Sequence, residues 1–303
     1  MTEAQLLDKL TLTLYESTQA FGDGMPALER EMMNRVMELV SQLETSNGRL
    51  KVTVKNIRLI RRIREELNSV ILTPKYRAKV DDLVDAVETV TELQTKYFDK
   101  INNGYTVGNV MLELKKATIE DIRLNLLDVG VNYNVSQKIA DVLRTQITAG
   151  GKFSDLEKAI RNTIAGENEG ALQRYAKTYA NDSLYTYSAQ YDQVFASDLG
   201  IEWYRWQGSI QESSRPFCVA MNENTQAGGC LQYIHVSEFP ELLRGHICGK
   251  TVPLNDKTDL PAGFKKNTTA ANFVTNRGGW NCQHKLIPTP TVAVPKAVRE
   301  RIK

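Results

Sequence analysis

The residues best suited to metal or thiol chemistry are confined to one part of the chain. All four cysteines and all three histidines fall between Cys218 and His284. Two pairs in this set are separated by a single residue: His246 with Cys248, and Cys282 with His284. On an extended strand, residues i and i+2 point to the same face, so each pair can offer two donors to one side. A Zn²⁺ ion takes four such nitrogen and sulfur donors in a tetrahedron, at about 2.0–2.3 Å.

This spacing is compatible with three interpretations. There is no C-x-x-C pair, so the pattern is not that of a familiar zinc finger. A structural zinc site is one interpretation, and free buried cysteines with surface histidines are the second. The third is a disulfide or a catalytic thiol. A cysteine nucleophile needs a neighbouring base and an orienting group. Cys218 and His246 are candidates for such a pair, but nothing local fixes their geometry.

A second candidate site is a run of basic residues from Arg49 to Arg64, which contains no acidic residue. On a helix, the apolar side chains of this run share one face, and Lys55, Arg58, Arg61 and Arg62 cluster on the opposite face. This positive face is suited to a polyanion, either the phosphates of a nucleic acid or an acidic protein surface. The alternative is a solvated helix face. The net charge of +2 argues against a protein dedicated to coating nucleic acid.

The elements that must position these residues are mainly helical. Apolar residues at helical spacing fill the first two-thirds of the chain, for example Leu28, Met32, Val36, Leu39, Val40 and Leu43. After Gly200 the periodicity fades, and the aromatic-rich segment 201–206 suits a strand. The expected fold is therefore a mainly α N-terminal two-thirds followed by a small α+β module that contains the cysteines and histidines.

The expected domain boundaries follow from these patterns. Residues 1–135 form a helical arm or bundle, and we expect these helices not to close a large core alone. They either pack as an antiparallel bundle or splay against a partner surface, and the second arrangement suits a docking protein. Residues 136–290 form the module, with helices first and then short strands and loops. Residues 291–303 form an extended tail. No apolar run reaches the roughly 20 residues of a membrane helix, and no signal peptide is visible. We therefore expect synthesis in the cytoplasm, where four cysteines favour thiols or metal ligands over a disulfide framework.

The stretch from Tyr175 to His284 resembles the Mu F-like minor head proteins of tailed phages, the phage head morphogenesis family. The resemblance is carried by residues in the order typical of that family. They are Thr178, Asn181 and Asp182, then Gly200, Trp203 and Trp206, then Ser213-Ser214-Arg215-Pro216-Phe217-Cys218, and finally Gly278-Gly279-Trp280-Asn281-Cys282-Gln283-His284 with Pro288.

The sequence departs from the family pattern at three places. Met221 stands where a second cysteine is frequent, and Ser213 stands where an acidic residue precedes the arginine. The final C-R-C of the family becomes Cys282-Gln283-His284, an exchange that keeps a metal donor but cannot keep a disulfide. This exchange favours metal. We therefore expect Cys218, Cys282 and His284, together with His246 or Cys248, to converge on one zinc ion.

The resemblance implies a structural virion protein rather than an enzyme. Such a protein acts in head assembly, in contact with the portal or the major capsid protein, in several copies and in some cases near the packaged DNA. The expected location is the virion head, with no role at a membrane. Two alternatives from other classes remain. One is a cysteine-dependent hydrolase or transferase that uses Cys218 or Cys282, and the other is a DNA-binding factor that uses the basic helix 49–64.

Overall fold

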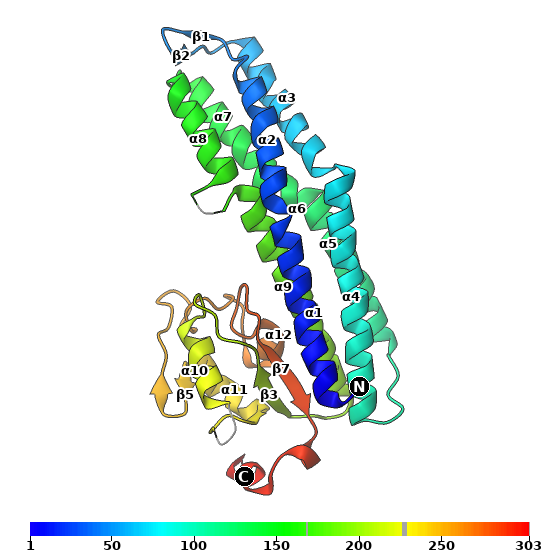
Figure 1. The fold of residues 1–303 in the computed structure, drawn as a ribbon. Coiled ribbons are helices and arrows are strands. Elements are labelled where there is room, and N and C mark those ends of the chain that lie inside the picture. Colours follow the sequence, from blue (N-terminus) through cyan, green and yellow to red (C-terminus); the bar gives the residue numbers. More distant parts are fainter. Residues whose placement is uncertain (168, 226–228, 303) are drawn as a thin grey trace. The chain divides into compact units, whose positions relative to one another are not determined.

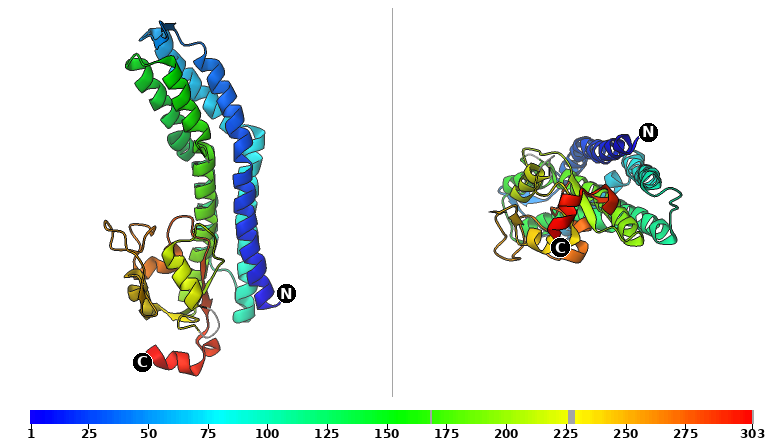
Figure 2. Two further views of the ribbon diagram at one scale, coloured as in Figure 1. Left: turned by 60° about the vertical axis from the view of Figure 1, so that its left-hand side comes forward. Right: turned by 90° about the horizontal axis from the view of Figure 1, so that it is seen from below.

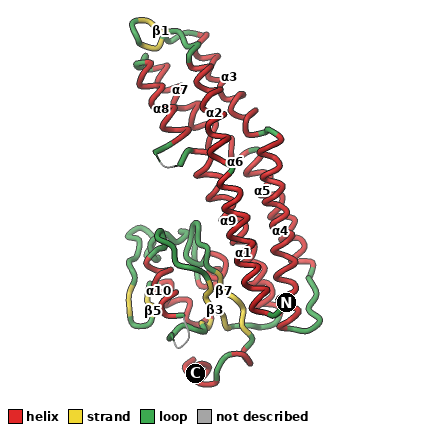
Figure 3. Tube along the Cα trace, in the orientation of Figure 1, coloured by secondary structure: helices red, strands yellow, loops and turns green. Residues whose placement is uncertain are grey.

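The computed structural model describes residues 1–167, 169–225 and 229–302. Its first two-thirds are mainly helical, and the region that follows holds short strands together with the Cys/His cluster, so the predicted fold class is confirmed. Figure 3 shows how short the strands are. None of the described helices combines the length and the apolar character needed to cross a bilayer.

The chain divides into two compact units that do not follow the expected boundary at residue 135. The first unit comprises Met1–Tyr15, Ala86–Thr118 and Asn181–Lys303, and the second comprises Glu16–Asp85 and Ile119–Ala180. The units interleave in sequence because four long helices each contribute residues to both. These helices are α1 (Glu3–Asp23), α4 (Pro74–Ile101), α5 (Asn109–Leu127) and α9 (Ala171–Asp198).

The second unit contains a closed ring of four helices. Helix α2 packs on α3, α3 on α7, α7 on α8 and α8 on α2, and Figures 1 and 2 show these helices side by side. Their bounds are Met25–Val40 (α2), Val54–Ile71 (α3), Gln137–Thr148 (α7) and Phe153–Ala165 (α8). Helix α6 (Val129–Val131) and a π-helical turn (Asn132–Ser136) precede α7.

Apolar side chains at helical spacing fill the interior of this ring. Leu28, Met32, Val36 and Val40 on α2 are all buried. The α2 stripe is therefore covered within the chain, and the helices form a bundle rather than a splayed arm. A hairpin of β1 (Thr45–Ser46) and β2 (Arg49–Leu50) connects α2 to α3. Helix α3 begins at Val54 because the Thr53 side chain accepts a hydrogen bond from the Asn56 amide and caps the helix.

The first unit carries a three-stranded antiparallel sheet in the order β4-β3-β7. Its central strand is the aromatic segment expected from the sequence. The strands are β3 (Trp203–Gln207), β4 (Ile234–His235) and β7 (Lys285–Thr289). Helices α10 (Pro216–Asn224), α11 (Phe239–Leu243) and α12 (Phe273–Asn276) and the hairpin β5 (His246–Ile247)–β6 (Lys250–Thr251) complete the module. Phe217 lies at the centre of its core, with ring centroids 4.8 Å from Phe264 and 6.0 Å from Trp206.

A buried ion pair fastens this sheet to helix α9. The Lys285 ammonium on β7 lies 3.0 Å from the Asp192 carboxylate on α9, and both side chains are almost inaccessible to solvent. The Gln94 amide on α4 donates to the other oxygen of Asp192 at 2.7 Å. These contacts fix β7, and with it the loop that precedes β7.

The tail from residue 291 is not extended as the prolines predicted. It forms a 3₁₀ turn (Thr291–Ala293), helix α13 (Lys296–Arg299) and a second 3₁₀ turn (Glu300–Ile302). Pro290 and Pro295 stand at the N-cap positions of the first turn and of α13. A proline with fixed φ at the start of a helical turn costs no hydrogen bond, so these residues begin turns instead of extending the chain. The Arg301 guanidinium holds the tail in place by donating to the carbonyl oxygens of Cys230 and Tyr233.

Candidate metal centre

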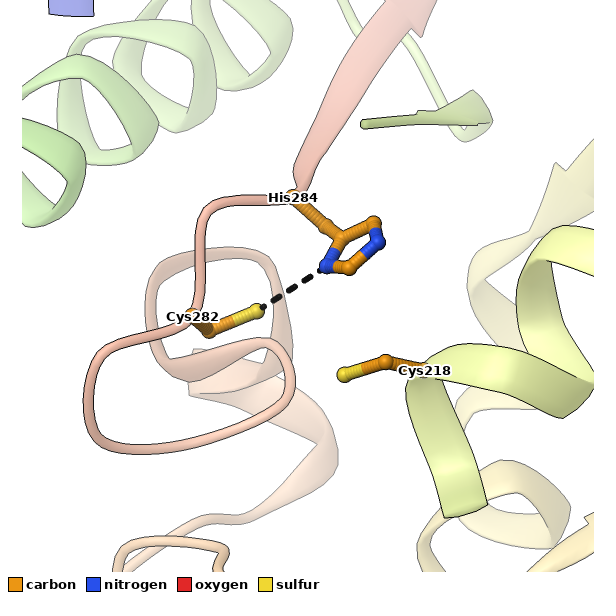
Figure 4. A group of neighbouring side chains, drawn as sticks. All are labelled: Cys218, Cys282 and His284. Atoms are coloured by element: carbon orange, nitrogen blue, oxygen red, sulfur yellow. Dashed lines mark hydrogen bonds between the residues drawn. The ribbon is translucent and has the colours of Figure 1, made fainter. Parts of the chain in front are cut away.

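Three buried side chains of the first unit point toward one another (Figure 4). They are Cys218 on α10 and Cys282 and His284 in the loop before β7. Their candidate ligand atoms all lie within 4.8 Å of one another, and Cys282 Sγ is 3.7 Å from His284 Nδ1. The side chains are only 3–4% exposed. The structure thus brings together three of the five residues that the sequence suggested as metal ligands.

The loop between α12 and β7 positions Cys282 and His284 by tight turns. Arg277 and Asn281 adopt positive φ angles of 45° and 56°, and Gly279 has φ 90°. The Gly279 amide donates to the Asn276 carbonyl at 2.8 Å. The two donors therefore converge through the geometry of a loop, and not through the alternation of side chains along a strand that their spacing predicted.

Gly278 leaves the space between the two sulfurs open. A Cβ atom at this position would lie 2.7 Å from Cys218 Sγ and 3.0 Å from Cys282 Sγ. Similarly, a Cβ at Gly208 would lie 2.4 Å from the His284 ring. Any larger residue at either position would displace a donor, so these glycines are part of the site. In the sequence, Gly278 stands out only as part of a motif, and no pattern marks Gly208.

Aromatic stacking fixes the orientation of the histidine. The Trp206 ring on β3 stacks on the His284 ring, with centroids 4.9 Å apart and an angle of 20° between the planes. The Nε2 atom of His284 is buried and has no hydrogen-bond partner among the described residues. The Nδ1 atom faces Cys282. The imidazole is therefore held with one nitrogen directed toward the sulfurs.

Side chains from two helices hold the loop that carries Cys282. The Asp182 carboxylate on α9 accepts a hydrogen bond from the Asn281 amide at 2.7 Å. The Asn181 side-chain oxygen accepts one from Gln283 at 3.3 Å. At the start of α10, Arg215 donates to the Gly278 carbonyl at 2.8 Å and also to the Trp280 carbonyl.

The surroundings of the two thiols shift their pKa values in opposite directions. A hydrogen bond from the Cys218 thiol, followed by the neighbouring His284, holds the pKa of Cys282 well below its usual value. The same hydrogen bond, together with burial, raises the pKa of Cys218. Arg277, a buried cation whose guanidinium donates to the Tyr185 carbonyl, also favours the Cys282 thiolate. The contact between the two thiols therefore shifts their pKa values in opposite directions.

The structure does not bring His246 or Cys248 into this group. His246 on β5 is exposed, and its Nδ1 lies 2.8 Å from the Glu241 carboxylate. Cys248 forms a disulfide with Cys230, with a Cα–Cα distance of 6.2 Å. The expectation that one of these two residues completes the site was wrong. The preference for thiols over a disulfide holds for Cys218 and Cys282 but not for Cys230 and Cys248. Both residues sit at or beside the β5–β6 turn, which directs them to the surface, and one-residue spacing does not reveal a turn.

The basic face predicted on α3 is present in the second unit. Lys55, Arg58, Arg61 and Arg62 are all exposed. Lys55 lies 3.4 Å from Glu44, and Arg61 lies 3.6 Å from Glu65. For Arg58 and Arg62 no partner is found within the described part of the chain. Exposed ion pairs of this kind are weak, so the face keeps most of its positive charge.

The Cys/His arrangement suits a soft metal ion better than covalent catalysis. A tetrahedral site with Zn–S near 2.3 Å and Zn–N near 2.0 Å has S–N edges of about 3.6 Å, close to the observed separation of 3.7 Å. A catalytic thiol must reach its substrate, whereas Cys218 and Cys282 are each 3% exposed. Comparison of the chain with protein-family models, curated proteins and solved structures found no match in any of the three.

Proposed function

We propose that this chain is a structural, non-catalytic minor head protein of a tailed phage, which acts in head assembly at the portal or the capsid. One observation carries the proposal. Several of the residues that resemble the Mu F-like family fasten a single loop. Asn181, Asp182 and Arg215 hold the loop backbone or side chains, and Cys218 packs against Cys282. Residues used in this way maintain a shape, which is the requirement of an assembly protein.

The burial of the thiols supports a structural role over the rival enzymatic one. A cysteine hydrolase needs its sulfur and its base open to substrate. Cys218, Cys282 and His284 are closed off by Trp206 and by the loop that contains Gly278. His246, the other candidate base, pairs with Glu241 on the surface.

The exposed basic face of α3 supports contact with a polyanion. Arg58 and Arg62 are accessible, and a phosphate backbone or a carboxylate-rich portal surface would neutralise them. We propose that this face takes part in incorporation into the head, beside an acidic portal surface or the packaged DNA.

Mass spectrometry of density-purified particles of the phage that encodes this chain tests the assignment. We expect the chain to co-sediment with heads at a constant ratio to the major capsid protein. Absence from the particles would overturn the proposal. The variant Arg58→Glu/Arg62→Glu should be incorporated less well and with weaker dependence on salt. The matched control is Lys296→Glu/Arg299→Glu, which reverses two exposed cations of the tail. Equal incorporation of the two variants would contradict a role for the α3 face.

A further inference from the structure

Two sulfurs and one imidazole nitrogen meet in the core of the module. Cysteine sulfur and histidine nitrogen are the donors that zinc takes in proteins. Cys218 and Cys282 lie together in the core of the module, each 3% exposed. A divalent cation between two thiolates would give a neutral complex, which is the form that suits such a buried position.

The geometry leaves room for one ion. The three ligand atoms lie within 4.8 Å of one another, whereas the edges of a tetrahedral zinc site are about 3.6–3.8 Å. Small shifts of the side chains therefore suffice to close the site around an ion. The absence of a Cβ at Gly278 keeps the space beside both sulfurs free. Trp206 holds the imidazole plane, so that its Nδ1 atom points inward.

We propose that Cys218 Sγ, Cys282 Sγ and His284 Nδ1 bind one Zn²⁺ ion, with a water molecule as the fourth ligand. The inference goes beyond the proposed function, since a role in the phage head does not depend on a metal. Two sulfurs and an imidazole select zinc over Ca²⁺ and Mg²⁺, which prefer oxygen ligands. Within the described residues no further His, Cys, Asp or Glu donor joins the group. The remaining cysteines form a disulfide, and His235 and His246 lie next to carboxylates elsewhere.

Such an ion would link distant segments of the module. Cys218 belongs to α10, and Cys282 and His284 precede β7. In a module with short strands and long loops, this cross-link supplies folding free energy that the core alone does not. Zinc bound in this way would therefore contribute to the folding of the module.

Elemental analysis of the untagged full-length protein, purified without chelators from zinc-supplemented medium, tests the proposal. We expect about one equivalent of zinc per chain. The variants Cys218→Ser, Cys282→Ser and His284→Ala should each lower the content at least tenfold. The double variant Cys230→Ser/Cys248→Ser and the variant His246→Ala are matched controls that should keep the ion. Wild-type protein with under about one-tenth of an equivalent would overturn the proposal, as would equal zinc in all variants.

Two measurements separate loss of ligation from loss of folding. X-ray absorption at the zinc edge of the wild-type protein should report two sulfur and two nitrogen or oxygen neighbours. The variant His284→Cys preserves a donor, so it should retain zinc and report three sulfurs, a change that a purely structural histidine would not produce. Any other sulfur count in the wild type, or failure of His284→Cys to gain a sulfur neighbour, contradicts the ligand set.

Discussion

The guanidinium of Arg215 donates a hydrogen bond of 2.8 Å to the carbonyl oxygen of Gly278. A second nitrogen of the same group donates to the Trp280 carbonyl. Arg215 directly precedes α10, and its planar guanidinium thus bridges two carbonyls of the loop that carries Cys282. A Cβ at Gly263 would lie 2.0 Å from the Arg215 side chain, so a neighbouring loop also packs closely on this contact.

Arg215→Lys should loosen the loop because an ammonium group does not reproduce the two-pronged geometry. We expect a loss of about 1.5–3 kcal/mol in the free energy of unfolding, the range for a hydrogen bond to a charged group. Urea unfolding, monitored by tryptophan fluorescence, measures this loss of free energy. Arg244→Lys, which alters an exposed arginine paired with Glu241, should change the free energy little. Equal effects of the two variants would show that the bridge to Gly278 contributes nothing specific.

Gly278→Ala should destabilise the module because the new methyl group would press on both sulfurs, at 2.7 and 3.0 Å. Overpacking of this kind costs about 1–3 kcal/mol. The matched control is Gly108→Ala, where a Cβ would meet nothing within 4 Å. Thermal unfolding of both variants compares them. A Gly278→Ala protein as stable as the control would mean that the sulfurs can move apart freely.

Lys285→Met should leave the buried Asp192 carboxylate without its counterion, the Lys285 ammonium 3.0 Å away. Breaking a buried ion pair from one side costs about 3–5 kcal/mol, whereas replacing both partners by uncharged groups is far less harmful. The double variant Asp192→Asn/Lys285→Met should therefore recover much of the loss. Arg144→Met, which breaks an exposed pair with Asp141, should cost under about 1 kcal/mol. A double variant no better than Lys285→Met would argue against charge burial as the cause.

The disulfide between Cys230 and Cys248 should be detectable by counting thiols. Denatured, unreduced protein is expected to react with alkylating reagent at Cys218 and Cys282 alone. After reduction all four cysteines should react. Opening a loop of this size should lower stability by about 3 kcal/mol. Four reactive thiols before reduction, in protein purified under air, would show that the pair does not form.

Glu29 should make the second unit more stable at acidic pH. Its carboxylate accepts a hydrogen bond from the Gln173 amide at 2.8 Å, and burial raises its pKa. The folded state therefore binds this proton more readily than the unfolded state, whose glutamate pKa is about 4.3. The resulting stabilisation is present below that value and is lost as pH rises through the folded-state pKa.

The variant Glu29→Gln removes this titration, so its free energy of unfolding should fall less than that of the wild type as pH rises from acidic to neutral. Urea titrations at a series of pH values measure the two slopes. Glu38→Gln, an exposed position on the same helix, serves as the control. Parallel curves for Glu29→Gln and the wild type would contradict the assignment.

Periodicity predicted the local elements well and the pairing of distant residues poorly. The stripe of Leu28, Met32 and Val36 was expected to need a covering surface, and the chain itself covers it. Which surface covers it was left open, because helical spacing identifies a face without identifying its partner. In the same way, the spacing of Cys282, His284 and Cys248 marked all three as candidate donors without identifying their partners. Cys248 was misassigned because its bond to Cys230 depends on the conformations of two loops, which composition does not encode.

The interleaving of the two units has a consequence for the order in which the chain matures on the ribosome. Residues 1–15 emerge well before their partners, because they pack with residues 86–118 and with the segment that begins at Asn181. All residues of the second unit have been synthesised once residue 180 is added, so this unit can fold first. Its folding would bring the flanking segments of the first unit closer together. The entropy lost on closing the first unit would then be smaller. Until then, apolar side chains such as Leu6, Leu10 and Leu14, which the finished protein buries, remain open to water. The nascent chain therefore passes through a long interval in which its N-terminus is a target for chaperones and for premature self-association.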